Sequence, residues 1–151
     1  MLNRLKDVFA SLQRHDVRYV IIGGIAAVLH GVPRATFDLD LLIDPTADNA
    51  ARLLAAFSEA GLGTADLTSP QDLLAHEITI FQDRVRIDVQ TSTPGLGFTE
   101  AWAGRVTMTY EGQTFFVVNR AHLIQSKRAS GRDVDLQDAA ILEIADQPGS
   151  A

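Results

Sequence analysis

A short apolar run that stops at two glycines constrains this chain more than any other feature. Tyr19 to Ile22 is rich in β-branched residues, and Gly23 and Gly24 follow it directly. Such a run is typical of a buried strand, and the glycines allow a tight turn that other residues resist. Helix-forming residues then extend from Ile25 to His30. The two glycines are therefore predicted to lie between a strand and a helix N-terminus.

Two further strands are predicted to carry acidic side chains on one face. From Phe37 to Ile43 the residues alternate, so that leucine and isoleucine occupy one face and Asp38 and Asp40 the other. From 85 to 90 the same alternation leaves Asp88 on the polar face. We therefore expect the three carboxylates to project from half-buried strands.

The remaining pattern predicts a mixed β-sheet flanked by helices, an α/β (α+β) fold. Helices are expected at 2–15, 47–60, 70–74, 120–130 and 134–146, and hairpins at 77–90 and at 106–118 with a turn at Glu111-Gly112. No repeat or long linker divides the chain. We expect one domain over 1–146 and a flexible tail at 147–151.

Composition narrows the possible partners and the cellular location. The 151 residues are 46% apolar, enough for one domain core, and the net charge of -6 gives no overall attraction to a nucleic acid. There is no cysteine, which excludes disulfides and thiolate metal sites. Charged residues near the N-terminus argue against a signal peptide, and the longest apolar runs are too short to cross a bilayer. A cytoplasmic protein without a membrane partner is expected.

Asp38 and Asp40 have the spacing that hard divalent cations require. Two aspartates at i and i+2 on a strand point the same way, about 6.6 Å apart along it. Magnesium prefers a few carboxylate oxygens together with waters and substrate phosphates. Asp88 is the best candidate for a third carboxylate. The simpler interpretation is that alternating acids only solvate a surface strand, and that Gly23-Gly24 is an ordinary turn.

The order of these motifs resembles the polymerase β-like nucleotidyltransferase superfamily. Its signature of two glycines, a short helix and Asp-x-Asp stands here as Gly23-Gly24 and then Asp38-Leu39-Asp40, with Asp88 as the third acid. A closer resemblance is to the Gly-Gly subgroup that includes toxins of abortive-infection and type IV toxin-antitoxin systems. That pattern reads Gly23-Gly24, His30-Gly31, Arg34-x-Thr36-x-Asp38-x-Asp40, Lys127, Gly131-Arg132 and Asp135.

The resemblance implies a minimal nucleotidyltransferase fold and a metal-dependent enzyme. It implies that Asp38, Asp40 and Asp88 hold Mg²⁺ or Mn²⁺ and perform the catalysis, and that nucleoside triphosphate, ATP for example, binds to Gly23, Gly24, Arg34, Thr36 and Lys127. A nucleoside monophosphate would pass to a hydroxyl on an RNA 3′ end such as that of tRNA, on a protein or on a small molecule. An antitoxin is a further expected partner.

Several alternatives stay open from the sequence. The chain could be a catalytically silent module that binds a nucleotide or a partner through the same fold. Lys127, Arg128 and Arg132 form a compact basic cluster, which could neutralise phosphates or simply solvate a helix end. Asp135 and Asp138 are expected to form only surface pairs with these cations.

Overall fold

Six strands form one mixed sheet in the computed structural model, which describes residues 1–145. The predicted tail at 147–151 lies outside the described residues. The order across the sheet is β3-β4-β2-β1-β6-β5, in which β1 runs antiparallel to β2 while β2 and β4 run parallel. The strands are β1 (Tyr19–Ile22), β2 (Leu39–Ile43), β3 (Ile78–Gln82), β4 (Arg86–Gln90), β5 (Val106–Tyr110) and β6 (Gln113–Val117).

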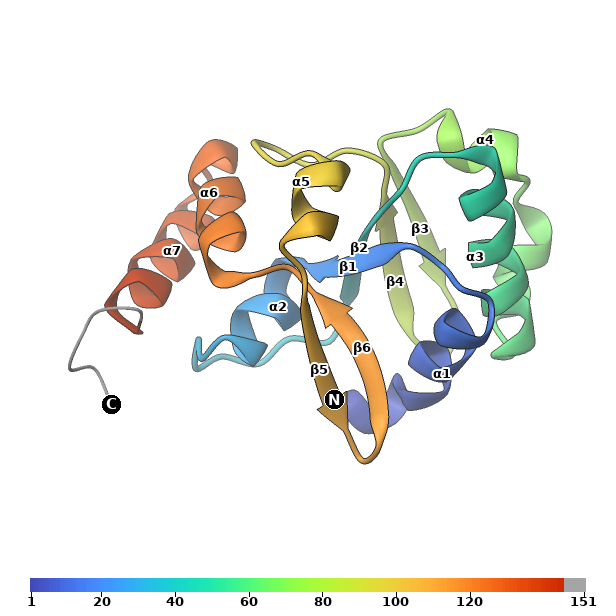
Figure 1. Cartoon of the computed structure of the whole chain (residues 1–151), viewed down its shortest axis with the longest axis horizontal. Helices are drawn as coiled ribbons and strands as arrows, with labels where there is room; N and C mark the ends of the chain where they lie inside the picture. The colour runs from blue at the N-terminus through green and yellow to red at the C-terminus, as the bar shows by residue number, and fades with distance from the viewer. Residues whose placement is uncertain (146–151) are drawn as a thin grey trace.

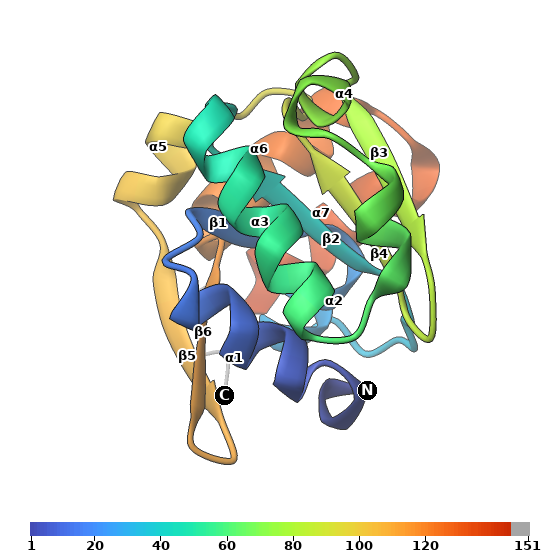
Figure 2. The same cartoon turned by 90° about the vertical axis from the view of Figure 1, so that its right-hand side faces the viewer.

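Helices cover both faces of this sheet, so the predicted mixed sheet with flanking helices is confirmed. In Figures 1 and 2, α1 and α3 lie on one face and α2, α6 and α7 on the other. The α-helices are α1 (Lys6–Arg14), α2 (Gly23–Leu29), α3 (Ala47–Glu59), α4 (Pro70–Leu74), α5 (Phe98–Ala103), α6 (Arg120–Ser130) and α7 (Asp133–Ala145), and two 3-10 turns occupy Leu2–Arg4 and Gly63–Leu67. None of the helices within residues 1–145 is long and apolar enough to span a membrane.

The core lies mainly between the sheet and the α1–α3 layer. Phe9 of α1 stacks on Phe115 of β6, with ring centroids 4.6 Å apart, and Phe57 of α3 meets Phe81 of β3 edge to face. All four rings are fully buried. This layer is packed with apolar side chains, which leaves the opposite face of β2 and β4 for polar residues.

Two element boundaries near the glycines differ from the prediction. The strand predicted from Phe37 begins only at Leu39, because its neighbour β1 turns into α2 just after Ile22, which pairs with Asp40. Phe37 is 78% exposed. The helix predicted from Ile25 begins at Gly23, so the two glycines form its first turn.

Two other differences concern helices. The predicted helix 2–15 is divided at Leu5 into a 3-10 turn and α1. Helix α5 was not predicted, because its six residues are too few to show helical periodicity.

Candidate functional site

Strand register places Asp40 and Asp88 side by side on β2 and β4, and Gly23, the residue after β1, completes a row beside Asp40. Asp40 of β2 pairs with Ile22 of β1 on one side and with Asp88 of β4 on the other. Gly23 follows Ile22 directly and starts α2. Residues paired across adjacent strands project to the same face of the sheet. The pairing of β2 with β4 therefore brings the sequence motif and the later aspartate together.

The glycine at position 23 is required by its conformation and by its neighbour. Gly23 has φ +72°, in the left-handed region that side chains rarely adopt. A Cβ built there would lie 2.4 Å from Oδ2 of Asp40. At Gly24, a Cβ would lie 2.7 Å from Oγ1 of Thr36 and 3.2 Å from Nη2 of Arg34. The missing side chains thus let three predicted site residues, Asp40, Thr36 and Arg34, approach the start of α2.

Asp40 lies in an environment that disfavours its negative charge. The pKa of this carboxyl is raised to about 7, first by burial and then by the negative charges of Asp88 and Asp38, while Arg86 and Lys127 act in the opposite direction. Desolvation and like charges both favour the protonated acid. A cation bound beside Asp40 would relieve the repulsion.

Arg86 is the cation closest to the other two acids. Its Nε and Nη2 atoms donate to the two oxygens of Asp88 at 3.0 and 3.3 Å, and Nε lies 3.8 Å from Oδ2 of Asp38. Asp38 precedes β2 and its side chain is half exposed. Within residues 1–145 no group of three or more acidic or histidine side chains is arranged to hold a metal ion. Asp40 and Asp88 are adjacent, whereas Asp38 approaches them from the preceding loop.

A buried ion network connects α6 and α7 beside this row. Lys127 Nζ lies 3.2 Å from Asp135 Oδ1 and 2.9 Å from Asp138 Oδ2, and all three residues are at most 5% exposed. Arg34 reaches the same Asp138 oxygen at 2.9 Å, which ties the loop before β2 to α7. The expectation that Asp135 and Asp138 form only surface pairs was wrong, because the two helices pack face to face over Lys127.

Arg132 lies at the exposed edge of the same network. Its Nε donates to Asp135 Oδ2 at 2.8 Å, and Ser130 Oγ donates to that same oxygen. Burial opposes ionisation of Asp135, but the hydrogen bonds from Arg132 and Ser130 and the charge of Lys127 outweigh it and hold the pKa of this carboxyl below its usual value. Asp135 is therefore a charged, fully engaged anchor.

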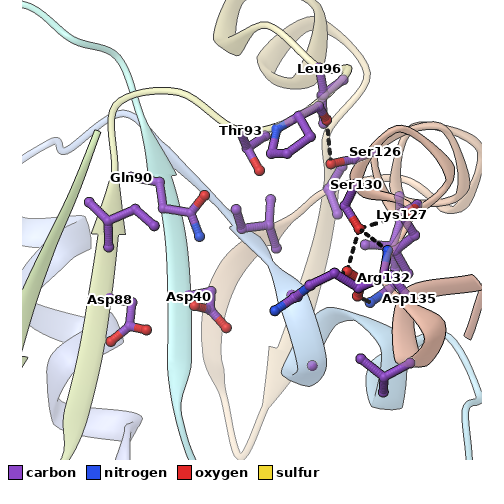
Figure 3. A pocket seen from close by; sticks show the side chains of 18 of the residues that line it. Asp40, Asp88, Gln90, Thr93, Leu96, Ser126, Lys127, Ser130, Arg132 and Asp135 are labelled. Atoms are coloured by element: carbon purple, nitrogen blue, oxygen red, sulfur yellow. Dashed lines mark hydrogen bonds and ion pairs between the residues drawn. The ribbon is translucent and has the colours of Figure 1, made fainter. Parts of the chain in front are cut away.

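A cavity of about 570 Å³ joins the row of acids to the ion network. Figure 3 shows Asp88 and Asp40 on one side, Lys127, Arg132 and Asp135 on the other, and Gln90 and Thr93 nearby. Six of the eight predicted site residues line it: Gly23, Gly24, Arg34, Asp40, Asp88 and Lys127. Thr36 lies against Gly24, and Asp38 lies near Arg86, without lining the cavity.

Sequence reasoning did not assign a site role to several residues that line this cavity or lie beside it. Arg86 could have been found from its position two residues before Asp88, which places both on one face of the strand. Gln90 follows from the same spacing. Asp138 carried no comparable signal, because its contact with Arg34 depends on how α7 packs against a loop more than a hundred residues earlier.

Comparison with known proteins identifies the family of the chain and a similar fold. Residues 2–147 match the model of a family described as nucleotidyltransferase of unknown function, DUF6036. No curated protein matches the chain. The crystal structure of a candidate nucleotidyltransferase from Thermotoga maritima, TM1012, is similar with a TM-score of 0.56 at 15% identity, over 94% of this chain and 89% of that one. The structural likeness supports a nucleotidyltransferase-like fold, and the match over nearly the whole sequence places the chain in the DUF6036 family of nucleotidyltransferases.

Proposed function

We propose that this protein transfers a nucleoside monophosphate from a nucleoside triphosphate to a hydroxyl acceptor with the help of Mg²⁺ or Mn²⁺. The observation that carries the proposal is the row of Gly23, Asp40 and Asp88 at one wall of a cavity whose other wall holds cations. Carboxylates suit hard metal ions, and cations with helix N–H groups suit phosphates. One cavity thus combines both requirements of phosphoryl transfer.

The carboxylates fit a divalent cation by their chemistry. Asp40 and Asp88 are paired across β2 and β4, and Asp38 adds charge from the preceding loop. Burial, followed by the charges of Asp88 and Asp38, raises the pKa of Asp40 to about 7. Asp40 and Asp88 would hold the ion, with Asp38 joining them once Arg86 is displaced from it. When bound, the ion would supply positive charge that stabilises the negative charge of the transition state.

The protein side chains would position the reactants in this proposal. The N–H groups at the start of α2 would face the triphosphate, because Gly23 and Gly24 both line the cavity. The acceptor oxygen attacks the α-phosphorus, the bond to the bridging oxygen breaks and pyrophosphate leaves. Asp88 accepts the hydroxyl proton. Positioning and charge neutralisation provide most of the rate in such reactions.

A labelled-transfer assay tests the proposal. The protein is incubated with each α-³²P nucleoside triphosphate, Mg²⁺ or Mn²⁺, and in turn tRNA, protein extract and small hydroxyl compounds. Transfer is expected with the wild type and a loss of more than about a hundredfold with Asp40→Asn or Asp88→Asn. Asp66→Asn, an exposed acid of the 3-10 turn behind α3, is the matched control. Absence of metal-dependent transfer to every acceptor would contradict the enzyme.

The second candidate is a silent module that binds nucleotide through the same cavity. The engagement of both Asp88 oxygens by Arg86 favours it, since that pairing satisfies the acid without a metal. Calorimetry with ATP and Mg²⁺ separates the two readings: binding without turnover favours the module. A toxin with an RNA acceptor and a partner antitoxin is the biological role that the sequence resemblance suggests, and co-expression toxicity assays with Asp40→Asn as control would test it.

A further inference from the structure

The cations around the cavity differ in the number of N–H donors that remain available to a ligand. Lys127 is 5% exposed, and its ammonium contacts the carboxylates of Asp135 and Asp138. An ammonium has three N–H donors, and two of them already face carboxylate oxygens. Lys127 therefore neutralises the two aspartates first, although sequence reasoning assigned it to the nucleotide.

Arg132 has the opposite character. Its side chain is 74% exposed and it lines the cavity. Among residues 1–145, the guanidinium is engaged only through its Nε, by Asp135. A guanidinium has five N–H donors in a rigid plane, so the four on its two terminal nitrogens remain available. That fork matches two oxygens of a phosphate.

The Arg132 guanidinium is oriented by its hydrogen bond to the buried Asp135. Gly131 ends α6 in the left-handed conformation and places Arg132 at the turn into α7. Asp135 is buried and is itself held by Lys127 and Ser130, so the anchor of the Nε atom is rigid. Figure 3 shows the Arg132 side chain reaching into the cavity toward Asp40. The negative charge of Asp40 also contributes to the raised pKa of Arg132, after the hydrogen bond and charge of Asp135.

We infer that Arg132 is the residue that grips the phosphates of the bound nucleotide, and that Lys127, Ser130 and Asp135 form the base that orients it. The inference rests on the proposed function and assigns the ligand contact within the same cavity. The site lies across the cavity from Asp88, so a polyphosphate held by Arg132 extends away from the acids. In this assignment the carboxylates hold the metal ion, and Arg132 binds the phosphates that leave as pyrophosphate.

Arg128 provides a matched control on the same helix end. It is also a largely exposed arginine, 59% for its side chain, but it pairs with Glu143 and does not line the cavity. Replacing either arginine with alanine removes one positive charge from an exposed position. A general electrostatic effect would therefore weaken both variants alike, whereas a direct contact affects only one.

The experiment measures the affinity of inorganic tripolyphosphate and of ATP by titration calorimetry in the presence of Mg²⁺. Arg132→Ala is expected to weaken both ligands by about 10- to 100-fold, the effect of losing a charged bidentate hydrogen bond, and Arg128→Ala by less than about twofold. Arg132→Lys should restore part of the affinity, because it keeps the charge and loses the fork. Unchanged unfolding temperatures of the arginine variants would show that they fold.

The outcomes separate this inference from the proposed function. If the wild type binds ATP and tripolyphosphate and Arg132→Ala binds them with equal affinity, the role of Arg132 is overturned and the nucleotide site stands. Equal weakening in Arg128→Ala also overturns it, since charge alone would then explain the effect. A wild type that binds neither ATP nor tripolyphosphate refutes the proposed function, and the role of Arg132 with it.

Discussion

Replacement of Lys127 with methionine should reveal that this lysine supports the fold of the α6–α7 pair. Methionine keeps most of the side-chain volume and removes the charge that faces Asp135 and Asp138, both at most 5% exposed. Removing one partner of a buried ion pair costs about 3 to 5 kcal/mol. Each aspartate keeps a guanidinium, from Arg132 and Arg34 respectively, so we expect the lower end, about 3 kcal/mol.

Urea and thermal unfolding, followed by circular dichroism, measure this loss. For a domain of this size, about 3 kcal/mol corresponds to a lower Tm by about 6 to 12 °C. The control is Lys6→Met, whose exposed pair with Glu111 should contribute less than about 1 kcal/mol. Because Asp138→Asn removes one of the two charges that Lys127 neutralises, the double variant should lose less than the sum of the singles, by about 1 to 2 kcal/mol. Additive losses, or a Lys127→Met loss below about 1 kcal/mol, would refute the buried-network reasoning.

Three further predictions concern the row of acids. Gly23→Ala should lower the free energy of unfolding by at least about 1 to 2 kcal/mol, the cost of a left-handed side chain, and should abolish transfer because the new Cβ displaces Asp40. Gly61 is also left-handed but has open space around it, so an equal loss of stability and of transfer in Gly61→Ala would show that backbone strain alone explains the effect. Because the pKa of Asp40 is raised from 3.8 to about 7, the metal-free protein should lose stability as pH rises from about 4 to 7. Asp40→Asn should remove this loss and raise the free energy of unfolding at pH 8 by at most about 4 kcal/mol. Unfolding curves with the same pH dependence in both proteins would contradict this prediction. Arg86→Met should make the unfolding temperature more dependent on Mg²⁺ than in the wild type, because Asp88 and Asp38 lose their internal cation; an equal response to Mg²⁺ in thermal shift would argue against competition between Arg86 and the metal.

The pattern of the sequence was sufficient to predict the strands and the face on which their acids lie. Alternation along β2 and β4 placed Asp40 and Asp88 correctly, since side-chain direction in a strand depends only on position. It did not predict that Asp38 precedes β2, because the length of a strand depends on its neighbour. Here β1 ends at Ile22, so the residues before Leu39 have no partner on that side.

The ion network could not be predicted for a related reason. Lys127 and Asp135 are eight residues apart and lie on different helices, so their contact depends on the packing of α6 against α7. Charged residues are usually exposed, and the sequence pattern around Asp138 resembles that of a solvated helix. Burial of these charges is a property of the assembled tertiary structure, which local periodicity does not contain.

The contact between Gly23 and Asp40 restricts which pairs of residues the two positions can hold. The space that a Cβ would occupy at position 23 is already filled by the Asp40 carboxylate, 2.4 Å from it. A family member that has a smaller residue in place of this aspartate is free of that contact, and only the left-handed backbone then limits position 23. Asparagine tolerates this conformation. A relative with asparagine at position 23 and a short side chain at position 40 would therefore keep the fold without the proposed metal-dependent transfer.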